Sequence, residues 1–374
     1  MVIGIDLHEA APGLRPTGTG RVARELARHL PAEMPADEFV FYSREGFPLG
    51  EEDNVRWEVC GRRDPSWHYE IGRHANRHAD VFLSPTSFLP SQFLRIPYVQ
   101  VVHDLVNRHW SATAKRRAVL VDRFTMRRAV HRAAGILTPS KAVRDELLEE
   151  FPNSPPATVM PEAADPMFHR YPEDEVSDVL RRYRISGDYV LCTGTIEPRK
   201  NLLRTVRAYE RLPAALRARY ALVLAGRLGW RAGPIVSAMS ESPSSETIRH
   251  LSFVPDEDLP KLYSGATALC YASLYEGFGL PLLEAMQSGT PVITSNRSSL
   301  PEVAGPAAHY VDPESEVSIS EALSALLSDD SERASLREAG LLRASEFSWD
   351  RTAELVAESI REAAGGPTTR DGSD

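Results

Sequence analysis

Short apolar runs alternate with amphipathic helical patterns along almost all of the 374 residues. This alternation predicts parallel β-sheets that carry helices on both faces. In the first half, the runs typical of strands are 2–6, 38–42, 55–59, 80–84, 98–103, 135–138 and 157–160. In the second half they are 189–193, 220–225, 250–254, 266–271, 291–294 and 309–311. The sequence therefore predicts an α/β protein with doubly wound, Rossmann-like sheets.

The border between the two halves is expected in a polar stretch, 161–188, that carries three prolines and few apolar residues. A length of 374 residues suits two domains better than one. We place an N-terminal domain at 1–170 and a C-terminal domain at 171–348. The last residues, 365–374, have little to bury and are predicted to be disordered.

Composition excludes several classes of protein. The formal net charge of −9 argues against a general nucleic-acid binder. No apolar run is long enough to span a bilayer, and the first residues read as a strand and not as a secretory leader. The three cysteines, Cys60, Cys192 and Cys270, are expected to be thiols in a reducing cytoplasm, because two of them fall in buried strands.

One segment, 275–284, combines groups suited to phosphate with groups suited to hydroxyls. It reads Tyr-Glu-Gly-Phe-Gly-Leu-Pro-Leu-Leu-Glu, and it joins an apolar strand to a helix that accepts Pro281 in its first turn. Its glycines allow close approach of a ligand, and the free N–H groups of the helix attract an anion. Glu276 and Glu284 would repel phosphate, so they are better suited to accept hydrogen bonds from sugar hydroxyls. The segment fits a nucleotide sugar.

A second segment, 194–201, supplies positive charge. It reads Gly-Thr-Ile-Glu-Pro-Arg-Lys-Asn, and it lies between the strand 189–193 and a helical pattern. Arg199 offers forked donors and Lys200 a point charge, a combination that neutralises a diphosphate. A basic helix start without a ligand is disfavoured, because cations near a helix N-terminus are unfavourable unless an anion is present.

Together the two strings resemble the signatures of retaining glycosyltransferases of the GT-B fold, family 4. The resemblance implies that two Rossmann-like domains face across a cleft, with acceptor binding in the N-terminal domain and donor binding in the C-terminal domain. It also implies a last helix, 349–364, that crosses back to the N-terminal domain, and the residues Phe347 to Asp350 match the start of that helix. Taken with the segment 294–302, the two strings look most like bacterial mannosyltransferases of this family.

The resemblance assigns roles to individual residues. Arg199 and Lys200 would oppose the charge of the leaving diphosphate, Glu276 would hold sugar hydroxyls, and Glu284 would accept from the ribose. His103, at the end of an apolar strand, would contact the donor sugar, although a core histidine bonded to a backbone carbonyl explains the same pattern. The remaining donor-binding candidates are Gly18, Thr19, Gly20, Gly194, Thr195, Phe253, Val254, Gly277, Phe278, Gly279 and Leu280.

Two of these candidate groups carry structural expectations. Residues 18–20 are expected in a glycine-rich loop that precedes a helix over 22–30, and Phe253 and Val254 are expected to recognise the base through their backbone. The nearby acids 256–258 suggest a metal site, but compensation of a helix dipole explains them better. Because the basic pair supplies the counter-charge, we expect neither a metal ion nor any other cofactor.

The reaction implied is transfer of a hexose, foremost mannose from GDP-mannose, to an acceptor hydroxyl with retention at the anomeric carbon. Other UDP-, GDP- or dTDP-sugars stay open as donors, and a lipid-linked glycan, a polysaccharide or a small natural product as acceptor. The alternatives are a nucleotide-sugar epimerase of the same fold and a non-catalytic scaffold subunit that binds a nucleotide sugar. A dehydrogenase is disfavoured by the incomplete glycine fingerprint near Gly18.

A basic helix is predicted at 115–132, with Leu120, Val121 and Phe124 as its packing stripe. It carries Lys115, Arg116, Arg117, Arg123, Arg127, Arg128 and Arg132 against the single acid Asp122. Such a helix suits anionic lipid or a lipid diphosphate, but a solvated face whose arginine stems cover the sheet is slightly favoured. We expect a cytoplasmic protein, with peripheral contact at the inner membrane face left open.

Overall fold

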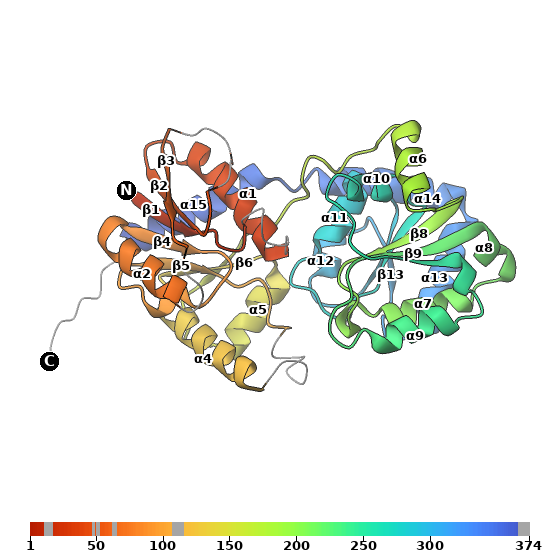
Figure 1. Ribbon diagram of the computed structural model, residues 1–374, viewed down its shortest axis with the longest axis horizontal. Coiled ribbons are helices and arrows are strands. Elements are labelled where there is room, and N and C mark those ends of the chain that lie inside the picture. Colours follow the sequence, from red (N-terminus) through yellow and green to blue (C-terminus); the bar gives the residue numbers. More distant parts are fainter. Residues whose placement is uncertain (11–17, 47–48, 50–52, 62–65, 107–115, 366–374) are drawn as a thin grey trace. The chain divides into compact units, whose positions relative to one another are not determined.

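The computed structural model describes all residues but 11–17, 47–48, 50–52, 62–65, 107–115 and 366–374, and for 116–122 it describes the backbone alone. The predicted disordered tail therefore lies outside the described residues, save Gly365. The chain forms two compact units (Figure 1). The N-terminal unit comprises Met1–Glu162 and Ser348–Asp374, and the C-terminal unit comprises Ala163–Phe347.

The N-terminal unit is built on a parallel sheet of seven strands in the order β3-β2-β1-β4-β5-β6-β7. Its strands are β1 (Val2–Asp6), β2 (Glu38–Ser43), β3 (Val55–Val59), β4 (Val81–Ser84), β5 (Tyr98–Val101), β6 (Gly135–Thr138) and β7 (Ala157–Val159). The strand order reverses at β1, as in a doubly wound sheet. All strands run in one direction, so their carboxyl ends meet at one edge.

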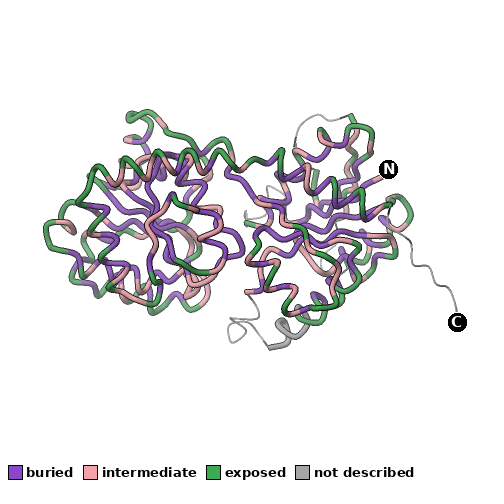
Figure 2. Tube along the Cα trace, turned by 180° about the vertical axis from the view of Figure 1, so that it is seen from behind, coloured by how far each residue is buried: buried purple, intermediate pink, exposed green. Residues whose placement is uncertain are grey.

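Helices cover both faces of this sheet. They are α1 (Gly18–Glu33), α2 (Ser66–His78), α4 (Arg116–Arg132), α5 (Lys141–Glu150) and α15 (Trp349–Gly365), with the short 3₁₀ turn η1 (Pro90–Gln92). Side chains of α2, α4 and α5 share one core with Tyr42 and Phe82 of the sheet. On the other face α15 contacts β4, β5 and β6 and lies against α1. Figure 2 shows the buried strands between helices that alternate buried and exposed residues.

The last helix belongs to the N-terminal unit, as the resemblance implied. Ser348 precedes it, and the Ser348 hydroxyl accepts a hydrogen bond from the backbone N–H of Arg351 at 3.2 Å. Thr352 donates its hydroxyl proton to the carbonyl of Pro161, so the helix is fixed to the end of the N-terminal segment. Val356 and Ile360 on the apolar face of this helix are fully buried. The N-terminal sheet and α1 cover that face, as an amphipathic helix requires.

The C-terminal unit is built on a parallel sheet of six strands in the order β10-β9-β8-β11-β12-β13. Its strands are β8 (Asp188–Thr193), β9 (Tyr220–Ala225), β10 (Ile248–Leu251), β11 (Ala268–Tyr271), β12 (Val292–Ser295) and β13 (His309–Val311). The order reverses between β8 and β11, which are neighbours in space although two strands separate them in sequence. In open α/β sheets, such a reversal opens a crevice at the carboxyl ends of the strands.

The helices of the C-terminal unit pack in two cores, one on each face of the sheet. They are α6 (Glu173–Arg182), α7 (Leu202–Glu210), α8 (Ala214–Arg219), α9 (Gly233–Glu241), α10 (Leu259–Ser264), α11 (Leu280–Gln287), α12 (Leu300–Ala304), α13 (Glu316–Ser328) and α14 (Asp330–Ala344), with the 3₁₀ turns η3 (Pro198–Lys200) and η4 (Ser245–Thr247). None of the helices among the described residues combines the length and the hydropathy that a bilayer crossing requires.

The predicted domain border at 170 is wrong, because the units divide between Glu162 and Ala163. Residues that the prediction gave to the first domain belong to the core of the second. Phe168 is buried there, and its ring lies 5.6 Å from the ring of Tyr263, edge to face. The two side chains bury apolar surface that the polar composition of the stretch did not reveal.

Strand β10 ends earlier than predicted. It pairs with β9 from Ile248 to Leu251, and its last partner is Ala225, where β9 itself ends. Beyond that point no neighbouring strand offers hydrogen bonds. Phe253 and Val254 therefore lie in the loop that follows the strand and not in the strand.

Two expectations for the N-terminal unit are also wrong. Residues 18–20 do not form a loop, since α1 already begins at Gly18 and includes them in its first turn. Phe124 does not belong to the packing stripe of α4, because it is 67% exposed. The buried positions of the described part of the helix are instead Thr125, Met126, Ala129 and Val130, which follow the helical period in a different phase.

Gly226 allows the turns after β8 and β9 to touch. Its N–H donates to the carbonyl of Leu251 at 2.9 Å, and a Cβ placed on it would overlap the carbonyl oxygen of Gly194. We expect Gly226→Ala to lower the free energy of unfolding by about 3 kcal/mol, because backbone must move to admit the methyl group. Gly233→Ala is the matched control, since nothing lies within 4 Å of a Cβ at that position. Equal stability of the two variants in urea unfolding would contradict this reading.

Candidate active site

The two segments singled out in the sequence meet at the carboxyl edge of the C-terminal sheet. The segment 194–201 follows β8, and the segment 275–284 follows β11, the strand beside it. A backbone hydrogen bond joins them directly, from the N–H of Leu274 to the carbonyl of Arg199 at 2.9 Å. The reversal of strand order thus places the basic pair against the acidic segment.

Arg199, Lys200 and Glu276 form one ionic cluster, which we call the charge triad. Nη1 of Arg199 lies 2.6 Å from Oε2 of Glu276, and Nζ of Lys200 lies 2.7 Å from Oε1. Glu276 is 7% exposed, so the shared carboxylate is almost withdrawn from water. The sequence predicted that the three residues serve one site, but not that the glutamate pairs with both cations.

Further contacts hold the two cations in place. Nε of Arg199 donates to Oε1 of Glu197 at 3.0 Å, and its Nη1 also donates to the carbonyl of Tyr275. Nζ of Lys200 donates to the hydroxyl of Tyr271 and lies 4.8 Å from the centre of that ring. Two positive charges are thus fixed side by side, an arrangement suited to a doubly charged anion.

The protonation of the triad follows from burial and charge. Burial alone would raise the pKa of the Glu276 carboxyl, but Lys200 and Arg199 outweigh it and lower the pKa to about 2. Burial lowers the pKa of the Lys200 ammonium, and Glu276 offsets this in part. Because burial penalises the ammonium, an additional anion at this place would stabilise it.

The turn that carries the cations depends on two unusual backbone positions. Asn201 adopts the left-handed conformation, with φ of 59°, and its side-chain amide donates to the carbonyls of Ala272 at 2.9 Å and Pro313 at 2.6 Å. Gly194 has φ of 108°, and a Cβ on it would lie 3.2 Å from Cε of Lys200. Thr195 follows Gly194 in this turn. The backbone of this turn therefore directs the side chain of Lys200 toward Tyr271 of the neighbouring strand β11.

The start of α11 is shaped in a similar way. Gly279 has φ of 124°, and a Cβ on it would lie 2.8 Å from a methyl group of Leu300. The hydroxyl of Ser299 donates to the carbonyls of Glu276 and Phe278, which orients the intervening Gly277. Leu280 begins the helix, and no side chain caps its N-terminus. Pro281 has no N–H group, and the N–H of Leu282 donates to the carbonyl of Gly279 at 2.9 Å. The donors that this turn offers to an anion are therefore the N–H groups of Gly279 and Leu280.

Phe278 and Glu284 lie deeper than the other candidates. Phe278 is buried, and its ring lies 6.0 Å from that of Phe347, so it serves packing. Oε2 of Glu284 accepts from the hydroxyl of Tyr263 at 2.8 Å, and that hydroxyl also contacts the hydroxyl of Thr193. Burial and the charge of Glu284 raise the pKa of Tyr263 well above its ordinary value, so the phenol keeps its proton.

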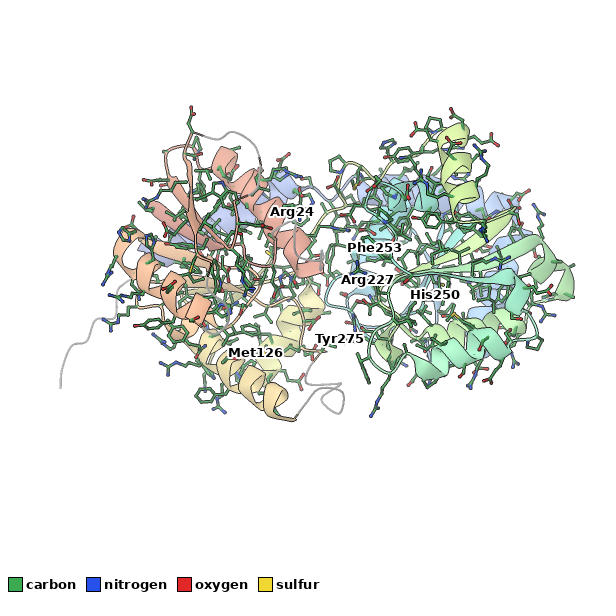
Figure 3. All side chains as sticks on the ribbon, in the orientation of Figure 1. Arg24, Met126, Arg227, His250, Phe253 and Tyr275 are labelled. Carbon is green, nitrogen blue, oxygen red and sulfur yellow. The ribbon has the colours of Figure 1, made fainter. Side chains whose placement is uncertain are left out.

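The two base-recognition candidates differ in exposure. Val254 is buried in the core of the C-terminal unit, whereas Phe253 is 48% exposed. Cζ of Arg227, in the turn after β9, lies 4.2 Å from the centre of the Phe253 ring. Figure 3 labels Arg227 and Phe253 near His250.

His103 lies in the N-terminal unit, two residues beyond the end of β5. Its Nε2 donates to the carbonyl of Pro85 at 2.6 Å, and its Nδ1 lies 3.5 Å from Oε1 of Glu162. Burial would lower the pKa of the ring, but the hydrogen bond and charge of Glu162 outweigh it and raise the pKa above its ordinary value. Both ring nitrogens are thus engaged within the unit, and a direct contact of His103 with a sugar stays a prediction.

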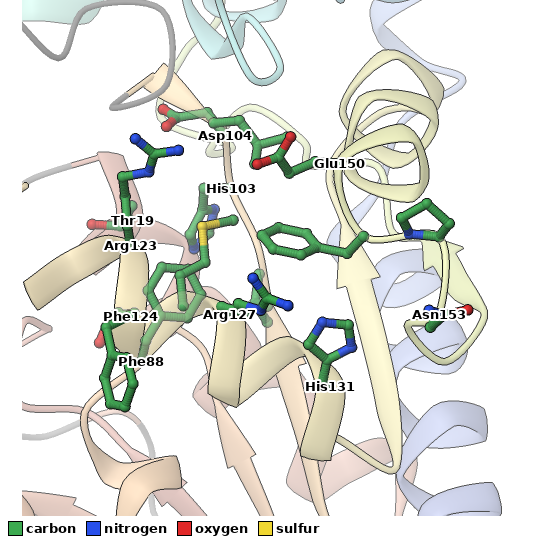
Figure 4. A pocket seen from close by; sticks show the side chains of 16 residues that line it. Thr19, Phe88, His103, Asp104, Arg123, Phe124, Arg127, His131, Glu150 and Asn153 are labelled. Atoms are coloured by element: carbon green, nitrogen blue, oxygen red, sulfur yellow. The ribbon is translucent and has the colours of Figure 1, made fainter. Parts of the chain in front are cut away.

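His103 and Thr19 line a cavity of about 560 Å³ within the N-terminal unit (Figure 4). Basic groups of α4, Arg123, Arg127 and His131, line it together with apolar side chains. The other lining residues are Thr86, Phe88, Val101, Asp104, Leu105, Phe124, Met126, Glu150, Phe151, Pro152 and Asn153. The cavity can receive a ligand with both an anionic and an apolar part.

Three supporting residues were missed in the sequence. Tyr271 ends an apolar strand, a position that faces the ligand edge of a parallel sheet, so its place was available as a signal. Asn201 closes the basic string, but its two carbonyl partners are distant in sequence. Tyr263 reaches Glu284 only through packing of α10 on α11, and no local pattern marks it.

The acidic run after β10 has a structural role. Asp258 accepts from Nη1 of Arg182 at 2.5 Å and from the hydroxyl of Tyr183 at 2.8 Å, and so ties α10 to α6. Asp258 stands at the N-cap position of α10 without a side-chain hydrogen bond to an N–H group of that helix, so compensation of the helix dipole by its charge stays a prediction. In the part of the chain that the structure describes, no group of three histidines, cysteines or acids is arranged to hold a metal ion.

Comparison with known proteins matches each half of the chain to a glycosyltransferase family model. Residues 16–167 match the model described as Glycosyltransferase Family 4, and residues 185–343 match the one described as Glycosyl transferases group 1. The O-antigen chain mannosyltransferase B of Escherichia coli is 36% identical over 273 residues, which are 72% of this chain and 71% of that protein. The serotype-specific mannosyltransferase WbdA of Escherichia coli is 33% identical over 192 residues, which are 51% of this chain and 24% of WbdA.

Solved structures share the architecture at low sequence identity. The crystal structure of Anabaena Alr3699/HepE in complex with UDP and glucose matches with a TM-score of 0.77 and 15% identity. The match covers 96% of this chain and 99% of that one. At this identity the likeness concerns the fold alone.

The charge triad predicts a pH dependence of stability. The pKa of Glu276 is lowered from 4.5 to about 2, so its pairing stabilises the folded chain above about pH 4.5 and is lost as the pH falls toward 2. We expect Glu276→Gln to remove roughly 3 kcal/mol of stability at pH 7. The difference from the wild type should shrink as the pH falls through this window in urea unfolding. Glu246→Gln, at an exposed glutamate of the same unit, is the control. A pH-independent difference would show that Glu276 is not ion-paired.

The pairing of His103 with Glu162 predicts a shifted titration. The folded-state pKa of His103 is raised, so this pairing stabilises the protein below pH 6.5 and is lost as the pH rises through the folded-state pKa. We expect Glu162→Gln to lower the pKa of His103, because the opposing carboxylate is removed. Titration of the ring protons by NMR measures it, with the exposed His131 in the same spectra as a reference for the variant's fold. An unchanged pKa of His103 in Glu162→Gln would mean that Glu162 does not raise the pKa of that ring.

Proposed function

The chain belongs to glycosyltransferase family 4, and from this premise we propose that it transfers mannose from GDP-mannose to an acceptor hydroxyl, with retention and without a metal ion. The observation that carries the proposal is the charge triad, which fixes two cations in the turn after β8, next to the strand β11 whose following turn leads into α11. Mannose is favoured as the sugar because relatives that share about a third of their aligned residues with this chain are mannosyltransferases.

The diphosphate of the donor binds Arg199 and Lys200 in this proposal. Its negative charge replaces that of Glu276 as the partner of the two cations, and the N–H groups of Gly279 and Leu280 add neutral donors. The carboxylate of Glu276, released from at least one cation, accepts hydrogen bonds from sugar hydroxyls. Glu284, oriented by Tyr263, accepts from the ribose.

Transfer breaks the bond between the anomeric carbon and the phosphate oxygen and forms a bond to the acceptor oxygen. Negative charge grows on the leaving diphosphate, where Arg199 and Lys200 are already in position, so little reorganisation is needed. The acceptor hydroxyl attacks from the face that the diphosphate leaves, and its proton passes to a phosphate oxygen. No side chain of the protein acts as a nucleophile, and the two cations take the place that a metal ion has in other transferases.

The acceptor is assigned to the N-terminal unit. Its cavity of about 560 Å³ joins apolar walls with the basic side chains of α4. An acceptor glycan that carries an anionic or lipid group matches this lining.

The experiment that tests the proposal incubates the purified chain with GDP-mannose, UDP-glucose and dTDP-glucose and a set of mannose-terminated acceptors. We expect release of GDP from GDP-mannose, formation of an α-linked product and full activity in EDTA. Arg199→Ala should lower kcat by about 10²- to 10³-fold, as loss of one preorganised donor does in other enzymes. Arg207→Ala, which removes an exposed arginine paired with Glu316, should leave kcat unchanged.

A separate experimental result would contradict each part of the proposal. Preference for a UDP- or dTDP-sugar would overturn the donor, a β-linked product would overturn retention, and loss of activity in EDTA would overturn the metal-free reaction. Conversion of the donor to an epimeric nucleotide sugar, without transfer, would favour the epimerase alternative. Unchanged kcat in Arg199→Ala would remove the charge triad from the site.

A further inference from the structure

An arginine that lies over a half-exposed aromatic ring at the carboxyl edge of the C-terminal sheet has no role in the reaction described above. Cζ of Arg227 lies 4.2 Å from the centre of the Phe253 ring, and Phe253 is 48% exposed. Arg227 follows β9 and Phe253 follows β10, and Figure 3 labels both. Because the strands are parallel, these residues lie at the same edge of the sheet as the turns that carry Arg199 and Glu276. Large exposed aromatic side chains at a ligand edge are suited to stacking.

The turn that carries Arg227 is bonded to the turn that carries the cations. The carbonyl of Arg227 accepts from the N–H of Ile196 at 2.8 Å, and the N–H of Gly229 donates to the carbonyl of Ile196 at 3.0 Å. Ile196 precedes the basic pair by only a few residues in the same turn. The position of Arg227 relative to the diphosphate-binding turn is therefore fixed by backbone hydrogen bonds.

The Arg227 turn is also fixed from the side of β10. Nε2 of His250 lies 2.8 Å from the carbonyl of Gly226, and the N–H of Gly226 donates to the carbonyl of Leu251. Neighbouring strands lie about 5 Å apart, so the end of β10 is on the order of 10 Å from the end of β8. A nucleoside whose diphosphate lies at the β8 turn can reach this far.

A second arginine–aromatic pair, at the start of β9, shows the features of a pair that serves structure alone. Cζ of Arg219 lies 4.8 Å from the ring centre of Tyr220, at the opposite end of β9. Tyr220 is 1% exposed, and Arg219 is neutralised by Asp188 at 3.2 Å. By contrast, among the described residues no carboxylate lies within ion-pair distance of Arg227, and its aromatic partner is open to solvent.

We propose that Phe253 stacks the nucleobase of the donor and that Arg227 reads its edge and selects guanine. This deepens the proposed function and rests on it, since it concerns the base of the same donor. Cζ of Arg227 lies over the Phe253 ring, and a guanidinium carries its N–H donors in its own plane. A base that stacks offset on the same face of the ring would therefore present its edge to these donors.

The hydrogen-bonding pattern of the bases explains the selection. Guanine presents two adjacent acceptors, O6 and N7, which match two N–H groups of a guanidinium. The edge of uracil presents the O4 acceptor beside the N3–H donor, so one arginine donor meets another donor. A site built for two hydrogen bonds rejects a base that leaves one of them unmade. Stacking on Phe253 depends little on the identity of the base.

The test measures binding of GDP and of UDP by calorimetry to the full chain and its variants. We expect the wild type to bind GDP more tightly than UDP. Arg227→Ala should weaken GDP binding roughly tenfold to a hundredfold while UDP binding stays close to that of the wild type. Arg227→Lys keeps the charge but loses the fork, so it should also lose the preference for GDP. Phe253→Ala should weaken both nucleotides to a similar extent.

Arg219→Ala is the matched control and should bind both nucleotides as the wild type does. Retained UDP binding in Arg227→Ala shows that the variant is folded. If Arg227→Ala and Arg227→Lys keep the full preference for GDP, the inference is overturned while the proposed function stands. If the wild type binds neither nucleotide, the proposed function and the inference fall together.

Discussion

One nearly buried carboxylate shared by two cations governs the arrangement of the donor site. Glu276 comes from the turn after β11, and Arg199 and Lys200 come from the turn after β8, so the triad ties two strands together at their carboxyl ends. Removing one partner of a buried ion pair leaves an uncompensated charge, which is strongly destabilising. The pairing with Glu276 therefore keeps two like charges close together, and in the proposed reaction the donor diphosphate takes over this role.

The fold supplies the proximity on which the triad depends. All six strands of the C-terminal unit are parallel, so every turn that follows a strand emerges at one edge. Reversal of the order between β8 and β11 makes neighbours of two turns whose residues Arg199 and Glu276 are 77 residues apart in the sequence. Two glycines with positive φ, Gly194 and Gly279, let these turns approach Lys200 and Leu300 without a clash. Backbone conformation and ion pairing thus both hold the turns after β8 and β11 together.

Much of this could be predicted from the sequence, because the signals are local. Apolar runs predicted the strands, and glycines, cations and acids at strand ends singled out the two segments that meet in the charge triad. What failed depends on contacts between distant residues. The phase of α4, which exposes Phe124, is set by the sheet beneath the helix, and the border before Ala163 is set by burial of Phe168. The pairing of Glu276 with both cations likewise needs two segments to be neighbours in space.

A crystal structure of the chain with bound GDP tests the central claim most directly. The account predicts that oxygen atoms of the diphosphate lie within hydrogen-bond distance of both Arg199 and Lys200, and that Glu276 has released at least one of them. A diphosphate bound elsewhere, or a triad that keeps all its ion pairs while GDP is bound, would contradict it.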